Sequence, residues 1–484
     1  MNRNLFRAAV LLIQAALLSA CTTVGPNYEL PASAAMNRAA ANAPFLGTAE
    51  ANFKNEPLPA RWWRLYDEPQ LDQLIQQALE ANADLRVAAA NLARTRAVAQ
   101  EIDAQGSPTI GVSAAPALGR ASGAAKGSPS ALADVWSYDT GVSVSYQADM
   151  FGKIARAAES ATADTQAGQA GVDLVRVTVA ADTARAYADA CAAARQMAVA
   201  QQSVDLQQKF VSLTDTRVRA GRGTALEISR ARSQLAQLQA AVPPWQAQYR
   251  TAHYRLAALT GRAPGEMNQH LLQCQAAPHL SAPIPVGDGA ALLRRRPDIR
   301  QAERNLAAAT ARIGVATADL YPSISLGVSA GSTGLLGSFG AANTFRWSLG
   351  PLISWTLPST GAARSRIAQA EAGSAGALAR FDGVVLNALR EVESAMTVYA
   401  RETERNAALK SARADSALAS EQSQRLYRYG RIDFLSVLDA DRTLATADAA
   451  LAASDALLAN DQISLFLALG GGWQHPADEG LSAN

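Results

Sequence analysis

The feature that most constrains this chain is a duplication: its two halves carry the same pattern of residues in the same order. The matched positions are Asp84-Leu85-Arg86 with Asp298-Ile299-Arg300, Pro108 with Pro322, Gly141 with Gly350, and Gly221 with Gly430. An internal repeat of this length predicts two copies of one structural unit. We expect the copies at about 71–261 and 286–471, joined by a proline-containing linker at 262–285.

Each half contains two segments in which apolar and polar residues alternate. We expect strands at about 108–118, 136–149, 322–332 and 344–357. A period of two fits a half-buried sheet or a strand that faces lipid, and the lengths match a tilted crossing of a bilayer. Known membrane barrels start at about 8 strands, so four strands cannot close one. The membrane interpretation therefore requires several chains.

The remainder of each half has helical periodicity. Bulky residues recur every seven positions, with small residues beside them: Val437, Leu444, Leu451, Leu458 and Leu465 in one stretch, and Leu378, Val385, Val392 and Tyr399 in another. Such spacing is typical of closely approaching helices. Segments 153–220 and 362–429 predict long helices of roughly 100 Å, and shorter helices of about 30 and about 37 residues stack to the same length. A soluble helical bundle shares this spacing but does not account for the alternating strands.

The first 20 residues read as a signal peptide, with a basic start and an apolar stretch. Leu18-Ser19-Ala20-Cys21 resembles the lipobox of bacterial lipoproteins. The resemblance implies that Cys21 carries an S-diacylglycerol and an N-palmitoyl group, and that 21–70 is a lipid-anchored N-terminal segment. Thr22, in place of Asp, favours sorting to the outer membrane. No later stretch of 18 apolar residues predicts a transmembrane helix, and residues 472–484 form a C-terminal tail.

Composition excludes several classes of function. The formal net charge is +2 with 18% charged residues, so there is no basic surface of the kind that nucleic-acid binders need. The four histidines have no metal-ligand spacing: His253, His270, His279 and His475. Cys191 lies in an alanine-rich helical stretch and Cys274 in the linker, so we expect free, unreactive thiols although the periplasm permits a disulfide.

Short motifs in both halves resemble the outer-membrane factor family, the TolC-type efflux channels. They are Trp62-Trp63, Tyr66, Leu71 and Leu74-Ile75, then Arg296-Pro297-Asp298-Ile299, Ala302-Glu303, Tyr321-Pro322-Ser323-Ile324-Ser325-Leu326, Glu391-Val392-Glu393, and Val437-Leu438-Asp439-Ala440 with Arg442. The resemblance covers nearly all of the mature chain, in order.

This resemblance implies a mainly α fold with a membrane β-barrel. Three chains would form a 12-stranded barrel in the outer membrane and a helical tunnel in the periplasm. It further implies a homotrimer that contacts outer-membrane lipid, docks to a periplasmic adaptor (membrane fusion) protein and serves an inner-membrane pump. The implied function is the exit duct of a tripartite efflux pump for drugs or other small molecules, without a cofactor, catalytic residues or a metal.

The resemblance also assigns site residues. Leu435, Asp439 and Arg442 would form the periplasmic gate, where three Asp439 carboxylates would repel anions and concentrate cations. The alternative is a surface ion pair between Asp439 and Arg442, three positions apart on one helix. The expected adaptor contact, for which ordinary turn chemistry is the alternative, comprises Arg219, Gly221, Thr224, Leu226, Arg428, Gly430 and Asp433.

Two other functions remain open at this stage. One is a pore-less, lipid-anchored coiled-coil structural or adaptor protein, which shares the helices and the anchor. The other is an esterase, because Gly327-Val328-Ser329-Ala330-Gly331 fits the G-x-S-x-G pattern. That motif needs a strand, a sharp turn and a helix. Here a glycine- and serine-rich loop is expected to follow, which argues against the esterase.

Overall fold

The computed structural model describes residues 23–127, 129–266, 274, 276–280, 282–355 and 360–472. The chain forms two compact units. The first comprises Met1–Pro31, Asn91–Gly168 and Gln301–Phe381, and the second Ala32–Ala90, Gln169–Arg300 and Asp382–Asn484. Each unit therefore combines segments from both sequence repeats.

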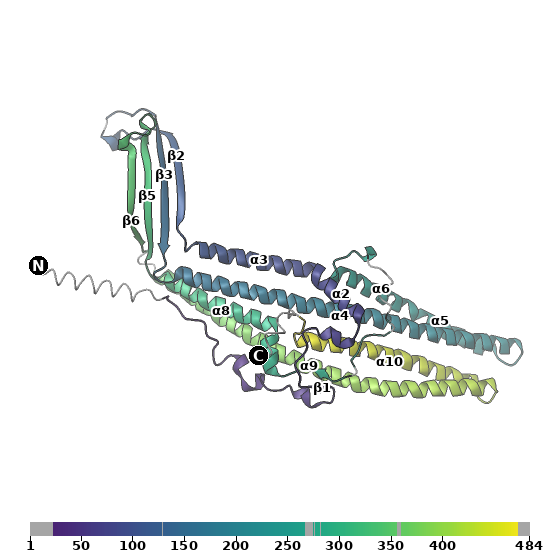
Figure 1. The fold of residues 1–484 in the computed structure, drawn as a ribbon. Helices are drawn as coiled ribbons and strands as arrows, with labels where there is room; N and C mark the ends of the chain where they lie inside the picture. Colours follow the sequence, from purple (N-terminus) through teal and green to yellow (C-terminus); the bar gives the residue numbers. More distant parts are fainter. Residues whose placement is uncertain are drawn as a thin grey trace. The chain divides into compact units, whose positions relative to one another are not determined.

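A four-stranded antiparallel sheet belongs to the first unit. Its strands are β2 (Thr109–Gly119), β3 (Val135–Ala148), β5 (Ser323–Leu335) and β6 (Phe345–Ser354), in the order β2-β3-β5-β6 (Figure 1). The two repeats meet where β3 pairs with β5, with Gly141 opposite Gly331. Large apolar side chains of the sheet stay exposed, among them Val112 (79%) and Trp347 (70%). Over the described residues of one chain, β2 and β6 are the edges of this sheet, with no further strand beside them.

Four helices contribute residues to both units: α3 (Ala83–Ala104), α4 (Lys153–Arg219), α8 (Pro297–Ala318) and α9 (Thr360–Arg428). In the first unit, the buried residues Ala163, Ala307 and Ala308 pack together between α4 and α8. The Ser160 hydroxyl donates to the carbonyl of Ala308 at 3.2 Å. Small side chains thus allow these two helices to approach closely.

The second unit adds α2 (Pro69–Ala81), α5 (Ala225–Ala240), α6 (Val242–Leu259), α7 (Gly289–Arg295) and α10 (Phe434–Ala468). Its core centres on the fully buried Trp62, whose ring stacks on Phe466 with centroids 4.7 Å apart. The short strand β1 (Phe53–Lys54) pairs in parallel with β4 (Ile284–Pro285) beside this core. Single turns of 3-10 helix lie at Ala35–Asn37, Ala39–Ala41, Leu46–Ala49, Trp62–Tyr66, Ala124–Lys126, Pro264–Glu266, Leu336–Ser338 and Ala342–Thr344.

The short helices are less continuous than their periodicity suggests. The first is divided at Asn82, which has extended backbone and whose Oδ1 accepts from the Asp84 N–H at 2.8 Å, capping α3. The corresponding break in the second repeat falls at Arg296, also extended, because the residue before a proline avoids helical backbone. A third break lies at Ala241, ahead of two prolines in the first turn of α6.

The cysteines in the helix and the linker form a disulfide, so the expectation of free thiols is wrong. Cys191 in α4 and Cys274 are bonded, with their Cα atoms 5.3 Å apart. The linker returns to the second unit, where both the N–H and the carbonyl of Leu280 bond the side chain of Gln462, at 3.1 and 3.2 Å. Spacing along the chain does not reveal this return, which brings the two sulfurs together.

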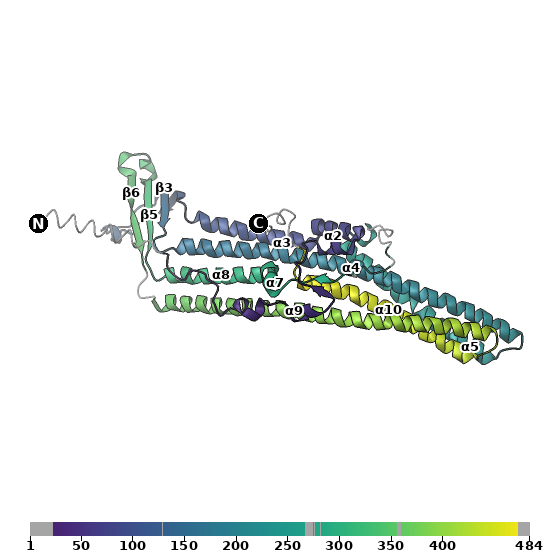
Figure 2. The same cartoon turned by 60° about the horizontal axis from the view of Figure 1, so that its bottom comes forward.

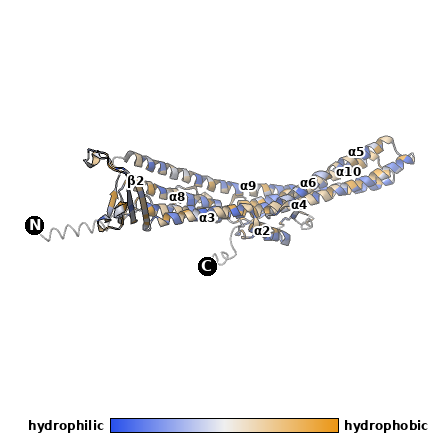
Figure 3. Cartoon of the chain, turned by 90° about the horizontal axis from the view of Figure 1, so that it is seen from above, coloured by the Kyte–Doolittle hydropathy of each residue, from blue (hydrophilic) through white to orange (hydrophobic). Residues whose placement is uncertain are grey.

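Figure 3 shows hydrophilic and hydrophobic residues interspersed along the long helices. Across the described parts of the chain, no helix combines the length and the apolar character that crossing a membrane requires.

Candidate functional site

The turns at 220–224 and 429–433, here called the tip turns, are built alike. Gly221 and Gly430 both have φ of +70°, which side chains other than glycine adopt only with strain. The Arg222 N–H donates to the Arg217 carbonyl at 2.8 Å, and the Arg431 N–H donates to the Leu426 carbonyl at 3.0 Å. This six-residue bond is the Schellman ending of a helix. The two glycines therefore reverse the chain at the ends of α4 and α9.

Both following helices begin with a capping residue. The Thr224 hydroxyl accepts from the Glu227 N–H at 3.2 Å, and the Glu227 carboxylate accepts from the Thr224 N–H at 3.0 Å. Asp433 accepts from the Ser436 N–H at 2.7 Å, and this bond holds the pKa of Asp433 below its usual value. Four of the seven expected adaptor residues, Gly221, Thr224, Gly430 and Asp433, thus have a local structural role.

The other expected adaptor residues present their side chains to solvent. Arg219 pairs with Asp215, one turn earlier, and its side chain is 76% exposed. Leu226 is 57% exposed, and Arg428 is also exposed. Tyr429, which sequence reasoning did not select, is 76% exposed beside them. These residues form a mixed cationic and apolar surface at the tip turns.

An aromatic cluster joins the two repeats behind the tip turns. Phe210 of α4 stacks on Phe434 of α10 at 5.4 Å between centroids, and Tyr427 of α9 lies 5.9 Å from Phe210. Arg217 places its guanidinium 4.4 Å from the centre of the Tyr427 ring. Figure 2 shows the ends of α4, α5, α9 and α10 gathered here. Sequence reasoning missed this cluster, although aromatic residues near both turn glycines are a signal in a chain with 6% aromatic residues.

The three expected gate residues lie on α10, but not as the surface ion pair that the sequence left open. Leu435 is 53% exposed, and Asp439 is exposed. The Arg442 guanidinium donates to the Gln234 side chain of α5 at 2.8 Å instead of pairing with Asp439. The Asp439 carboxylate is therefore exposed and forms no ion pair with any residue that the structure describes.

A second acidic residue of α10, Asp441, faces inward and was not anticipated. It accepts hydrogen bonds from Ser420 at 2.6 Å and from Gln424 at 2.9 Å, both on α9, and burial raises its pKa. Further along, Arg413 of α9 pairs with Asp448 of α10 at 2.7 Å. These contacts hold α9 and α10 together behind the exposed Asp439.

Another acidic pair lies between α9 and α10 farther from the tip. Burial, and then the charge of Glu402, raise the pKa of Asp461 from 3.8 to about 6. Because the folded pKa lies above the unfolded one, the cost of ionising Asp461 develops as the pH rises from about 4 to about 6. We expect Asp461→Asn to stabilise the protein at pH 7.5 by about 1 kcal/mol, because Asp461 is only partly buried and solvent screens much of the full pKa shift.

The test of this pair is thermal unfolding in detergent at pH 4.5 and pH 7.5. Asp461→Asn should raise the melting temperature at pH 7.5 by about 1–2 °C, and by much less at pH 4.5. The exposed Asp415 of α9 supplies the control, Asp415→Asn. An equal shift for Asp461→Asn at both pH values would mean that its ionisation does not matter for stability.

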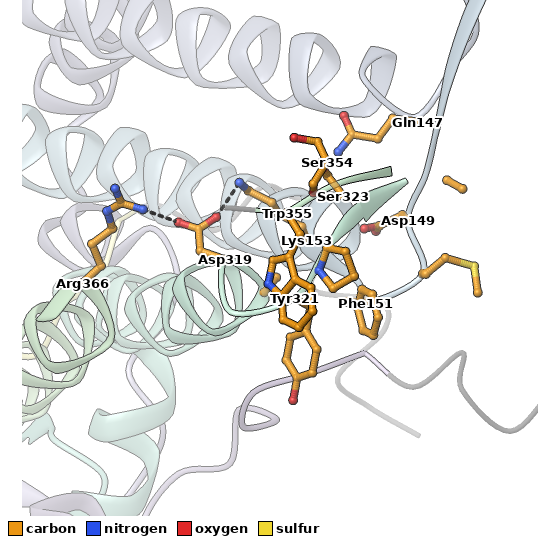
Figure 4. Close-up of a pocket in the computed structure, with 14 residues that line it drawn as sticks. Gln147, Asp149, Phe151, Lys153, Asp319, Tyr321, Ser323, Ser354, Trp355 and Arg366 are labelled. Atoms are coloured by element: carbon orange, nitrogen blue, oxygen red, sulfur yellow. Dashed lines mark hydrogen bonds and ion pairs between the residues drawn. The ribbon is translucent and has the colours of Figure 1, made fainter. Parts of the chain in front are cut away.

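The end of the sheet that leads into the helices of the first unit surrounds a cavity of about 340 Å³ (Figure 4). Asp319 bonds Lys153 at 2.6 Å and Arg366 at 3.0 Å. Partial burial opposes its ionisation, but the two cations hold the pKa of Asp319 below its usual value. The rings of Phe151 and Tyr321 stack at 4.6 Å. Aromatic and cationic side chains thus gather where the strands end.

The esterase motif has no catalytic surroundings. Ser329 lies inside β5, where its hydroxyl bonds that of Ser348 in β6 at 2.8 Å. The strand continues to Leu335, so the sharp turn into a helix does not follow. Over the described residues, no group of three or more His, Cys, Asp or Glu side chains could hold a metal ion. Cys21, His270 and His475 lie outside the described residues.

Comparison with known proteins identifies the chain's relatives. A family model described as outer membrane efflux protein matches residues 74–262 and 290–471. Nodulation protein T of Rhizobium leguminosarum bv. trifolii is 29% identical over 470 residues, or 96% of this chain and 97% of that protein. Pyoverdine export outer membrane protein OpmQ of Pseudomonas putida is 31% identical over 435 residues, or 87% and 90%. The outer-membrane channel OprN superposes with a TM-score of 0.86 at 34% identity and covers 94% of this chain and 100% of that chain.

These matches confirm the expected family and the mainly α fold with a membrane sheet. The family consists of transport channels, so the prediction that the chain is not an enzyme is also confirmed, as is its location in the outer membrane. The matches favour the channel over the pore-less coiled-coil alternative. With both halves matched, the chain belongs to the outer membrane efflux protein family and is an outer-membrane channel of an efflux system.

Proposed function

We propose that three copies of this chain close a 12-stranded barrel and form the exit duct of a tripartite pump, with a periplasmic adaptor and an inner-membrane pump as partners. The observation that carries the proposal is the sheet of the first unit. Its edge strands β2 and β6 have 11 and 10 residues, and the outer edge of each pairs with no other strand of the described residues, while apolar side chains of the sheet are exposed. Such edges pair readily with another chain, and barrel closure removes them.

The cargo is proposed to be small molecules, without selection by the duct itself. The relatives' names differ in cargo: one exports pyoverdine, and the CusC protein of Escherichia coli O157:H7 belongs to a cation efflux system. CusC is nevertheless 28% identical over 464 residues, or 94% of this chain. One channel architecture therefore serves several cargoes, which supports a pump that chooses the substrate.

Two sites complete the proposal. The exposed Arg219, Leu226 and Arg428 at the tip turns are the adaptor contact, since cationic and apolar side chains together suit a protein surface.

Cys21 carries the S-diacylglycerol and N-palmitoyl groups, and no other cofactor is needed. The relative named probable outer membrane lipoprotein SilC, from Salmonella typhimurium, supports the anchor at 25% identity over 465 residues, 94% of this chain and 97% of that protein.

The gate is proposed to be a ring of three Asp439 carboxylates near the tip turns, with Leu435 and Arg442 beside it. Asp439 is exposed and has no ion-pair partner among the described residues, so threefold symmetry would bring three unpaired charges together. A carboxylate ring concentrates cations in a narrow bore. Arg442, bonded to Gln234 of α5, holds the neighbouring helices in their present position.

We expect Asp439→Ala and, separately, Arg442→Ala to raise single-channel conductance in planar bilayers. Asp439→Ala should also reduce cation preference and block by divalent cations, because the ring charge is lost. The control is Asp415→Ala, which removes an exposed carboxylate from α9 and leaves α10 unchanged. It should change neither conductance nor ion selectivity. Native mass spectrometry of the same preparations should show three chains per particle. Unchanged conductance and selectivity in both variants would place the gate elsewhere, and a folded monomer would contradict the barrel.

A further inference from the structure

The N-terminal residues 23–28, here called the strap, lie against the first unit around one buried arginine. Arg156 in the first turn of α4 is 4% exposed. It donates to the carbonyls of Val24 at 3.1 Å and Gly25 at 3.2 Å, and to the Asn27 side chain at 2.8 Å. The remaining contact goes to Glu159 at 2.7 Å. A buried guanidinium thus receives three oxygen acceptors from one short peptide, which is a specific docking arrangement.

The strap fits so closely that two glycines are required. A Cβ on Gly25, whose φ is +88°, would lie 2.4 Å from the backbone Cα of Gly314. A Cβ on Gly152, whose φ is +73°, would lie 2.4 Å from the Thr23 side chain. In addition, the Val24 N–H donates to the Phe151 carbonyl at 3.2 Å. Hydrogen bonds and shape therefore both select this position of the strap.

The first residues of the docked strap lie beside the end of the sheet where aromatic side chains gather. The carbonyl of Phe151 holds Val24, while the ring of Phe151 stacks on Tyr321 (Figure 4). Trp355, which also lines that cavity, donates its indole N–H to the Leu320 carbonyl at 3.3 Å. Aromatic side chains of this kind favour the boundary between membrane and water. The strap thus reaches the part of the first unit that suits the membrane surface.

We propose that Arg156 is a docking site for the residues that follow the lipidated cysteine, and that it positions the lipid anchor beside the end of the sheet. This inference rests on the proposed lipidation of Cys21. Cys21 precedes Val24 by three residues, so the acyl chains attach within about 10 Å of the strap's first contact. If the loss of Arg156 also released the Val24–Phe151 bond, the strap would be held by the Tyr28 hydroxyl on Glu303, seven residues from Cys21, and the acyl chains could attach up to about 24 Å from that contact.

The first test measures the strap itself by hydrogen exchange of the full-length protein in detergent. We expect Arg156→Gln to speed exchange of the Val24 amide at least tenfold, because three of the strap's acceptors lose their donor. Gly25→Ala should have a similar effect with Arg156 intact, and Asn27→Ala a smaller one. The control is Arg312→Gln, which removes an arginine of the same unit whose ion pair is with Asp164 of α4 and not with the strap. Unchanged strap exchange in both Arg156→Gln and Gly25→Ala would overturn the docking site.

The second test measures the position of the lipid. Cells are grown with a palmitate analogue that carries a photoreactive diazirine, and cross-linked peptides are mapped after illumination. In the wild type, cross-links should concentrate on 147–155 and 318–323, and Arg156→Gln should at least halve that share while total labelling stays constant. An identical map in both proteins would overturn the positioning role.

A wild type that incorporates no analogue would disprove the lipid anchor of the proposed function, and the positioning role with it. Faster exchange of the strap in Arg156→Gln would still establish the docking site in that case. Channel conductance, measured separately, tests the duct and depends on neither the docking site nor the lipid anchor. The last variant is Cys21→Ser. It should abolish labelling and leave the hydrogen exchange of the strap unchanged, because Arg156 and the strap form the docking site without the lipid.

Discussion

Replacing Cys274 with serine is expected to lower the free energy of unfolding of the second unit by about 4 kcal/mol. The disulfide to Cys191 closes a loop of 83 residues, and cross-links of that length restrict the unfolded chain most strongly. It also fixes the linker beside Leu280, whose backbone bonds the buried Gln462. Cys191 remains as a fully buried thiol, which packs as a small apolar group.

The measurement is the melting temperature in detergent with and without a reductant. Wild type treated with dithiothreitol should melt at the temperature of Cys274→Ser, and the reductant should not affect the variant. The exposed Ala276, two residues away in the linker, supplies the control Ala276→Ser, which adds a serine hydroxyl and keeps the disulfide. If reduction leaves the wild-type melting temperature unchanged, the linker is held by its other contacts alone.

Arg296→Ala is expected to lower the free energy of unfolding by about 3 kcal/mol, because it removes a buried guanidinium from a buried carbonyl and two partly exposed carboxylates. The guanidinium bonds both carboxylate oxygens of Asp298, at 3.0 and 2.7 Å, and reaches Glu391 of α9 at 2.9 Å. It also donates to the carbonyl of Ala468, the last residue of α10, at 2.7 Å. One side chain therefore connects the α7–α8 break to two other helices.

Thermal unfolding of Arg296→Ala and Arg296→Lys separates charge from geometry. Lysine keeps the charge but lacks the planar fork, so it should recover less than half of the lost stability. The neighbouring Arg294 is exposed, and Arg294→Ala should change stability by about 0.5 kcal/mol or less. If Arg296→Ala and Arg294→Ala behave alike, the buried cluster contributes nothing beyond a surface arginine.

The elements that sequence reasoning found are those whose signals are local. Alternation of apolar and polar residues indicated all four strands of the sheet, and Gly221 and Gly430 marked the turns because a positive φ favours glycine. The break at Asn82 was missed because asparagine is tolerated inside helices. Its capping role depends on the local backbone and on a bond to the Leu259 carbonyl, 177 residues away.

What could not be predicted depends on contacts between distant parts of the chain. The Cys191–Cys274 bond forms because the linker returns to α4. The position of the strap depends on a contact between Asn27 and Arg156, which are 129 residues apart in the sequence. At the proposed gate, Asp439 and Arg442 have the spacing of an ion pair on one helix, yet Arg442 donates to Gln234 of the neighbouring helix. Spacing along a helix gives candidate partners, but the neighbouring helix determines which one is used.

The pairing of β3 with β5 has a consequence for biogenesis. Gly141 lies opposite Gly331, 190 residues later in the chain, whereas β2 and β3 form a local hairpin. At about 5–20 residues per second, roughly 10–40 s separate the synthesis of the two partners. During that interval the first hairpin has an apolar surface and two open edges, which are prone to aggregation. Slower synthesis of the second half should therefore lower the yield of folded channel more than the same delay within the first half.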